Sequence, residues 1–433
     1  MKKMKKLLAL TLTVLIAVSC LAACGSEEKP TSNSPESADG KLSGEITVWS
    51  WNAAADALTE IAELYMEKNP GTLIHVEYVD SDYEKLRPVL TSGIGVPDVF
   101  TTQQRDFPAF MHTYGDIFAD VTDILQPESE NFVEVCLKQA EKNGNFYAFP
   151  WDAGPCGLYY HIPTFEAAGV KVENIKTWED FMDAARTIKE KTGKYILSTD
   201  FNGSAGIDLA MLMLNQQSGQ VYDADGKVNL ASDEMLKTYE LILKMQEDDI
   251  IQNNPSGWNE RIQWLNEGKL CGVATAVWYA GTMVNSVGDR SGEWGLAPLP
   301  GFGEEQYMAA SGGSVVTIYK NSSNVELARD FVRFVCMDPE AAKINIEYGL
   351  FSAYKPSYSL PEYSEVSEYF GVPIGDTFAQ WTDAPAFNFG EFYTEIEPEI
   401  MIAQGEILLK GKEPVEALQE ATARAQRMID AKS

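Results

Sequence analysis

Histidine is scarce in this 433-residue chain, which has only His75, His112 and His161. None of them lies in a spacing typical of a metal site or of a catalytic triad. The chain also has no Gly-x-Ser-x-Gly turn and no glycine-rich loop that would cradle a phosphate. We therefore expect no metal and no cofactor, and no enzyme of these classes. A secreted glycoside hydrolase needs only two carboxylates about 5–10 Å apart, so the 64 aspartates and glutamates leave that class open.

Basic residues are also few, because 34 lysines and arginines face those 64 acids and leave a net charge of −30. Binding to nucleic acid requires basic patches, so nucleic acid is not an expected partner. Broad docking of the protein body on anionic lipid is disfavoured for the same reason. Loss of the first 23 residues would remove four lysines and bring the charge to about −34.

Cysteine occurs six times, twice near the N-terminus and four times in the body, at Cys136, Cys156, Cys271 and Cys336. The spacing of these four matches no zinc motif. They can form one or two disulfides outside the cell, or remain as free buried thiols. A body of about 390 residues can form a sufficient hydrophobic core without disulfide bonds, which favours free thiols.

No run of 18 apolar residues occurs anywhere, so no spanning helix is expected. Four lysines at the N-terminus precede a shorter apolar run at residues 7–18, typical of a secretory signal. The letters LAACG at 21–25 resemble the bacterial lipobox, which implies cleavage before Cys24 and a lipid on its sulfur. We expect a signal peptide at 1–23 and a lipidated cysteine with a flexible tether at 24–43. Such an anchor is typical of a Gram-positive source and places the protein on the extracellular face of the cell membrane.

Apolar periodicity predicts an α/β body. A strand at 46–49 precedes a helix whose apolar stripe is Leu58, Ile61, Ala62 and Tyr65, and strands near 72–80 and 96–102 flank a helix at 82–92. This order predicts a parallel sheet covered by helices. Further predictions are a helix near 130–142, a hairpin at 143–144, helices at 205–217 and 232–247, and two or three helices in the last eighty residues.

Three local details complete this pattern. Capping boxes are expected at Thr177 with Asp180 and at Ser323 with Glu326. The letters YDADGKVNL at 222–230 resemble the start of a calcium-binding loop but lack the ligands that such a loop has at its later positions. A plain turn is therefore expected. Trp264 lies within a predicted helix and is expected in the core.

Several fragments together resemble the family 1 extracellular solute-binding proteins of bacterial ABC transporters, the maltose-binding-protein-like group. They include ITVWSWN, PDVFTTQQRDF, YAFPWDAGPCGLYYHIPTFEAAGV, LNEGKLCGVATAVWYAG and GGSVVTIYKNSSNVELARDFVRFV, in the family's order over residues 44–433. The resemblance implies a two-lobed periplasmic-binding-protein-like fold, each lobe a mainly parallel sheet flanked by helices, with hinge crossovers between the lobes. It implies one lobe at 44–153 plus 296–338 and another at 156–293 plus 339–433, with crossings near 153–156, near 294–298 and after 338.

Ligands of open α/β sheets lie beyond the carboxyl ends of strands. The residues that follow the predicted strands, together with positions at which the family stacks sugars, define the expected ligand site: Trp51, Asn52, Gln103, Gln104, Arg105, Trp151, Asp152, Tyr160, Asp200, Asn254, Trp258, Trp278, Tyr279, Gly312, Gly313, Lys355 and Trp381. Aromatic rings bind the apolar faces of sugars, and amide or charged side chains bind their hydroxyls.

The resemblance implies a monomeric, non-enzymatic, lipid-anchored component of an ABC importer that captures an oligosaccharide and delivers it to the permease subunits. Two alternatives stay open beside this one. The solute could be a polyamine or a peptide instead of a sugar, or the protein could be a secreted glycoside hydrolase.

Overall fold

The computed structural model of the protein describes residues 42–204, 206–303 and 305–432. The predicted signal peptide and Cys24 lie outside these residues, as does the predicted tether up to residue 41. Within the described part, no helix is both long and apolar enough to cross a bilayer.

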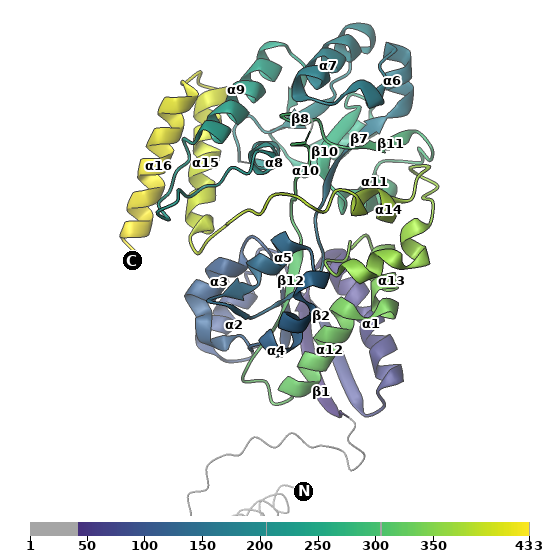
Figure 1. The fold of residues 1–433 in the computed structure, drawn as a ribbon, viewed down its shortest axis with the longest axis vertical. Coiled ribbons are helices and arrows are strands. Elements are labelled where there is room, and N and C mark those ends of the chain that lie inside the picture. The colour runs from purple at the N-terminus through teal and green to yellow at the C-terminus, as the bar shows by residue number, and fades with distance from the viewer. Residues whose placement is uncertain (1–41, 205, 304, 433) are drawn as a thin grey trace, which may run out of the picture. The chain divides into compact units, whose positions relative to one another are not determined.

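The first part of the chain forms the predicted β-α-β-α-β unit, in which the first three strands are parallel. Two further strands extend the sheet to the order β2-β1-β3-β12-β6, in which β12 runs antiparallel to both of its neighbours (Figure 1). The other four strands run in one direction, so this sheet is mainly parallel, as expected, with a single antiparallel strand. The elements are β1 (Gly44–Ser50), α1 (Asn52–Lys68), β2 (Thr72–Tyr78), α2 (Leu86–Ser92), β3 (Val99–Gln103), β6 (Phe149–Pro150) and β12 (Ser314–Ile318).

Both faces of this sheet are covered, because neighbouring residues on its strands enter different cores. Val99 and Val316 pack with α1 and α12 (Val325–Met337). Phe100 and Val315 pack instead with α2 and α3 (Phe107–Tyr114). This alternation is the period of two that a strand imposes, and it explains why the central strands are apolar on both faces.

The second sheet is antiparallel, with the order β10-β7-β11. A parallel pair, β8 and β9, joins it through a bridge between Tyr195 and Leu270. The expectation of a mainly parallel sheet therefore fails for this second sheet. The strands are β7 (Cys156–His161), β8 (Leu197–Thr199), β9 (Ile251–Asn253), β10 (Gly272–Ala276) and β11 (Trp294–Ala297).

Helices surround the second sheet, and α7, α8, α9, α15 and α16 share one hydrophobic core with it (Figure 1). The two helices predicted in the middle of the chain are α8 and α9, and those predicted at the end are α14 to α16. The bounds are α6 (Ile162–Ala168), α7 (Trp178–Thr192), α8 (Asp208–Gln216), α9 (Asp233–Glu247), α10 (Trp258–Asn266), α11 (Tyr279–Ser286), α14 (Ile374–Ala379), α15 (Tyr393–Leu408) and α16 (Pro414–Asp430).

The helix predicted near 130–142 is shorter than expected. It is α5 (Glu134–Gln139), and the chain then enters the predicted hairpin of β4 (Glu141–Lys142) and β5 (Asn145–Phe146). Asn143 and Gly144 have φ angles of 55° and 82°, as a type I′ turn requires. The remaining elements are α4 (Thr122–Leu125), α13 (Pro339–Glu347) and the 3₁₀ turns Gly115–Ile117, Gln126–Asn131, Val172–Asn174, Lys355–Ser359 and Pro361–Ser364.

One predicted capping box forms and the other does not. Thr177 and Asp180 exchange both hydrogen bonds at the start of α7. The box at Ser323 and Glu326 was wrong, because α12 begins after Asn324 and has no side-chain cap. The segment 222–230 is a turn, as predicted, in which Asp223 Oδ1 accepts from two backbone N–H groups, at Asp225 and Lys227.

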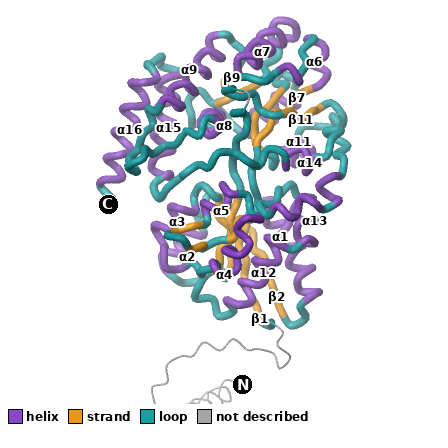
Figure 2. The backbone as a smooth tube through the Cα atoms, in the orientation of Figure 1, coloured by secondary structure: helices purple, strands orange, loops and turns teal. Residues whose placement is uncertain are grey.

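Three extended segments run side by side between the two sheets and are joined by backbone hydrogen bonds (Figure 2). Ser311 N–H donates to Gly154 O over 2.8 Å, and Ala153 N–H donates to Phe351 O over 2.7 Å. A Cβ on Gly154 would lie 1.9 Å from Ser311 O, so only glycine allows this approach. Segments 153–155, 310–313 and 351–353 connect the two sheets side by side, and we refer to them together as the hinge.

Candidate functional site

A polar network joins the end of β3 to two of the crossing segments. Gln104 Nε2 donates to Asp152 O over 2.7 Å, and Gln104 N–H donates to Gly313 O over 3.0 Å. Asp152 Oδ1 in turn accepts from Ser314 N–H over 2.8 Å. Gly313 has a φ of 97°, and a Cβ there would lie 2.6 Å from Gln104 Nε2, so a larger residue would displace the amide.

The carboxyl group of Asp152 is buried in this network. Burial raises the pKa of Asp152 to about 7, and the hydrogen bonds from Ser314 oppose that rise. The hinge therefore contains an acid that titrates near neutral pH. Its side chain serves the hinge, because its resolved hydrogen bond goes to the crossing segment.

An aromatic cluster lies beside the same crossing segment. Trp258 and Trp278 stack with ring centroids 5.9 Å apart and planes 23° apart, and Tyr279 packs edge-on against both. Trp278 Nε1 donates to Ser311 O over 3.0 Å, and a Cβ on Gly312 would lie 2.9 Å from that nitrogen. Trp258 is 44% exposed, so the stack offers an aromatic surface to solvent next to the hinge.

Arg105 reaches from the first sheet to a helix of the second. Its Nη1 lies 3.0 Å from Glu397 Oε1 on α15, and its Nε lies 4.0 Å from Asp106 Oδ1. Burial lowers the pKa of Arg105, but the negative charges of Glu397 and Asp106 outweigh it and raise the pKa overall. The guanidinium is therefore a fixed cation that bridges the two sides of the protein.

A polar pocket of about 20 Å³ lies at the carboxyl ends of β8 and β9. Asp200, Asp208, Asn254 and Arg261 line it. Asn254 Oδ1, Arg261 Nε and Ser198 Oγ are buried and have no hydrogen-bond partner among the described residues. Unpaired buried polar atoms are costly, so this pocket is suited to hydroxyl groups or to ordered water.

A second pocket, of about 50 Å³, lies between the two sides and has mainly apolar walls. Gln104 and Gln139 line it from the first side and Asn215 from the second, and Phe387 and Phe389 close it from the segment that precedes α15. Gln139 Nε2 donates to Phe387 O over 2.6 Å, and Asn215 Nδ2 donates to Pro385 O over 2.8 Å. Sequence reasoning missed all of these except Gln104, and it also missed Asp208, Arg261 and Glu397, because none of them follows a strand directly or lies in a quoted motif.

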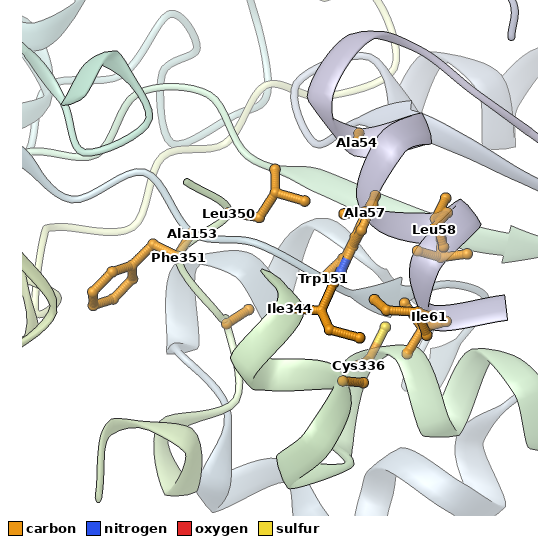
Figure 3. Packing of buried hydrophobic residues seen from close by; sticks show 14 of the residues in the cluster. Ala54, Ala57, Leu58, Ile61, Trp151, Ala153, Cys336, Ile344, Leu350 and Phe351 are labelled. Atoms are coloured by element: carbon orange, nitrogen blue, oxygen red, sulfur yellow. The ribbon is translucent and has the colours of Figure 1, made fainter. Parts of the chain in front are cut away.

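Trp151, which we expected under a sugar face, is a core residue. It is 1% exposed and lies between α1 and the helices α12 and α13, with Ala57, Ile61 and Cys336 around it (Figure 3). Its Nε1 donates to Asn345 Oδ1 over 3.1 Å. The residue precedes the hinge in sequence, but its strand directs the ring away from solvent.

Other expected site residues also lie apart from the network and the aromatic cluster. Trp381 is buried against Phe378. Tyr160 packs on Phe165 in the core of the second side, and Lys355 is exposed on a 3₁₀ turn. Tyr279, in contrast, belongs to the aromatic cluster, where it is fully buried and packs edge-on against both tryptophans. Trp264, expected in the core, is instead only half-buried near the end of α10.

The residues at the ends of β1 and β3 form a third group. Trp51 packs edge-on against Tyr83, with ring centroids 5.9 Å apart. The Tyr83 hydroxyl accepts from Gln103 N–H over 2.8 Å and donates to Asp106 Oδ2 over 3.0 Å. Asn52 is exposed with a φ of 45°, an uncommon angle for a residue other than glycine. Tyr83, which the sequence did not single out, thus connects Trp51 to the segment that carries Arg105.

Comparison with known proteins decides the family. Residues 50–336 match the model of the bacterial extracellular solute-binding protein family. The chain belongs to this family. This solute-binding protein is 28% identical to the arabinooligosaccharide-binding protein of Bacillus subtilis over 349 residues, 78% of each chain. It is 29% identical to the lactose-binding protein of Rhizobium radiobacter over 395 residues, 88% of this chain and 92% of that protein.

Solved structures support the fold of this solute-binding protein. The sugar-binding protein MalE of Xanthomonas citri superposes with a TM-score of 0.78 at 18% identity, over 90% of this chain and 98% of that one. The binding protein of B. animalis subsp. lactis in complex with beta-1,6-galactobiose gives a TM-score of 0.71 at 24% identity, over 89% and 97%. The two-lobed periplasmic-binding-protein-like fold is thus confirmed. The protein is a binding component and not an enzyme, and the described residues contain no group of acids, histidines and cysteines placed to hold a metal.

Proposed function

We propose that this solute-binding protein captures an oligosaccharide between its lobes and delivers it to the permease of an ABC importer. The observation that carries the proposal is the exposed Trp258–Trp278 stack beside the hinge. Sugars combine apolar C–H faces with hydroxyl edges, so they suit a flat aromatic surface with polar side chains around it. Gln104 and Arg105 lie at the end of β3 on the first side of the hinge, and Asn254 and Arg261 line the polar pocket on the second side.

The names of the relatives support a saccharide. The Bacillus subtilis relative binds arabinooligosaccharides, and the Rhizobium radiobacter relative binds lactose, as their names state. Both match over most of their length, so the comparison covers both lobes. Neither is similar enough to assign the sugar of this chain.

We keep the division into two lobes as part of the proposal. Backbone hydrogen bonding favours lobe boundaries that differ from residues 296 and 338, the boundaries predicted from the sequence. β11 pairs along its whole length with β7, which favours the second crossing at 310–313. α13 packs against α1 and α12, which favours the third crossing at 351–353.

Ligand entry requires the lobes to separate. The two pockets of about 20 and 50 Å³ hold only one to a few water molecules and are too small for a disaccharide. We expect the lobes to rotate apart about the three crossing segments and to close over the sugar. Small-angle scattering of the monomeric protein should show compaction on addition of the ligand.

The proposed anchor is a lipid on Cys24, which holds the body at the extracellular face of the membrane. Cys24→Ser should release the protein from the cell envelope, while the affinity of the body for its ligand stays at the wild-type value. Fractionation of cells labelled with a palmitate analogue measures the first effect. Retention of the label in the mutant would contradict the lipobox interpretation, and Cys20 is the residue to test next.

Titration calorimetry tests the solute. The panel contains arabinooligosaccharides, galactooligosaccharides, lactose and maltooligosaccharides of two to five units. We expect micromolar or tighter binding of at least one of them, with the sugar recovered intact afterwards. Absence of binding across the panel would refute the proposal, and recovery of cleaved sugar would revive the hydrolase alternative.

A cationic solute is the second candidate, favoured by the carboxylates of Asp200 and Asp208 in the polar pocket and of Glu397 beside Arg105. Putrescine and spermidine therefore belong in the same calorimetric panel. Binding of either amine without binding of any sugar would make this candidate the function.

A further inference from the structure

Charged side chains line the polar pocket and join the two sides of the protein at Arg105, and acids outnumber bases among them. On the first side Arg105 lies beside Asp106, and Glu397 faces it from α15. In the polar pocket Arg261 lies with Asp200 and Asp208. Each cation is thus matched by two carboxylates, and the lining carries a net negative charge.

Glu397 forms an ion pair with Arg105 and thereby determines how strongly this guanidinium can attract a negatively charged ligand. The distance of 3.0 Å between Arg105 Nη1 and Glu397 Oε1 is that of a charge-assisted hydrogen bond. Both side chains are partly exposed, with 37% and 26% of their surfaces accessible to water. A guanidinium that is already paired with one carboxylate attracts a second carboxylate only weakly. The charges of Asp106 and Asp208 would in addition repel a carboxylate of the ligand.

We propose that this lining selects against acidic saccharides, and that Glu397 enforces the selection by occupying the guanidinium of Arg105. The inference rests on the proposed function and narrows its substrate class to uncharged oligosaccharides. Hydroxyl groups can donate to the carboxylates and accept from the guanidinium groups, whereas a uronate carboxylate can only accept. A uronate would therefore meet like charge without a free cationic partner.

The same feature explains why Arg105 can still bind a neutral sugar. Its Nε is buried without a hydrogen-bond partner among the described residues, although Nη1 is occupied. A hydroxyl oxygen carries no net charge and can accept from the guanidinium N–H groups that Glu397 does not occupy. Glu397 therefore leaves hydrogen-bonding capacity in place while it removes electrostatic attraction for anions.

Calorimetry on the whole protein tests the inference with two probes of equal length, galactobiose and digalacturonate. We expect wild type to bind galactobiose on the order of 100-fold more tightly than digalacturonate in low salt. Glu397→Gln frees Arg105 and should reduce this ratio at least about tenfold. Because exposed charges are screened by salt, 0.5 M NaCl should also narrow the wild-type ratio.

Glu395→Gln is the matched control. It removes the same charge two residues away on α15, where Glu395 pairs with Lys432, and it should leave the selectivity ratio unchanged. Thermal melting of both variants shows that they are folded.

Equal affinity of wild type for the two probes, or equal ratios in wild type and Glu397→Gln, would overturn the inference and leave the proposed function standing. Failure of every neutral sugar in the panel would instead remove the proposed function, and this inference with it.

Discussion

The indole N–H of Trp151 donates to Asn345 Oδ1 over 3.1 Å, and Asn345 Nδ2 donates to Val335 O over 3.1 Å. This pair connects the strand that leads into the hinge with the junction between α12 and α13. Both residues are buried, so each would leave an unpaired polar group if the other were removed. The pair holds the base of the hinge in place.

Trp151→Ala should lower the free energy of unfolding by about 3–5 kcal/mol, the usual cost of removing a large buried ring. The affinity for ligand in the folded fraction should stay near the wild-type value, because the ring does not reach the cleft. Denaturant titration and calorimetry measure the two quantities. A mutant of normal stability with weakened binding would place Trp151 in the site after all.

Trp258→Ala and Trp278→Ala should each lower the affinity for the oligosaccharide about five- to a hundredfold. One aromatic face contributes roughly 1–3 kcal/mol to the free energy of binding. Trp264→Ala is the control, because Trp264 lies near the other end of α10 and is absent from the aromatic cluster. Calorimetry on all three variants provides the comparison. Equal loss in Trp264→Ala, or no loss in the first two, would show that the sugar lies elsewhere.

Gly154→Ala should destabilise the hinge strongly, because its Cβ would meet Ser311 O at 1.9 Å and both atoms belong to backbone. We expect a loss of at least about 2 kcal/mol in the free energy of unfolding, with altered ligand affinity. Gly281→Ala in α11 has open space around its Cβ and should be neutral or stabilising by up to about 1 kcal/mol. Similar melting temperatures for the two variants would contradict the close packing of segments 153–155 and 310–313.

Asp152 should make stability depend on pH. Burial raises its pKa to about 7 in the folded protein, whereas an unfolded aspartate titrates near 4. The folded state therefore binds this proton more tightly, and the contribution of Asp152 to stability falls as the pH rises from about 4 to about 7. Asp152→Asn still accepts from Ser314 N–H but cannot ionise, so its stability relative to wild type should be greater at pH 8 than at pH 4.5. A constant difference between the two proteins across that range would show that Asp152 is not perturbed.

Reducing agent should shift the melting temperature little. Cys136, Cys156, Cys271 and Cys336 are all buried and free in the described structure, and burial raises the pKa of Cys136 and of Cys271 to about 12. A protein whose cysteines are buried thiols should also react slowly with iodoacetamide until it unfolds. A fall of ten degrees with reductant would reveal a disulfide.

The sequence predicted helices, turns and caps correctly where residues close together in the chain determine the structure. The apolar stripe of Leu58, Ile61 and Tyr65 determined α1, and Asn143-Gly144 determined the hairpin, because both signals act within a few residues. The capping box at Thr177 is another local exchange of hydrogen bonds. Gln104, Asp152 and Gly313, which the sequence predicts in the ligand site, lie in one hydrogen-bonded network, and their contact with a ligand stays a prediction.

Tertiary structure alone decided which aromatic rings face solvent and which charges meet. Trp151 is in the core because α1 and α13, nearly 300 residues apart in sequence, close over it. Arg105 and Glu397 are 292 positions apart, and no local pattern relates them. The antiparallel pairing of β7 with β10 and β11 likewise depends on segments that meet only after the chain has folded. The sequence determined the elements and the family resemblance, and long-range packing determined which of its tryptophans are exposed and which of its charges are paired.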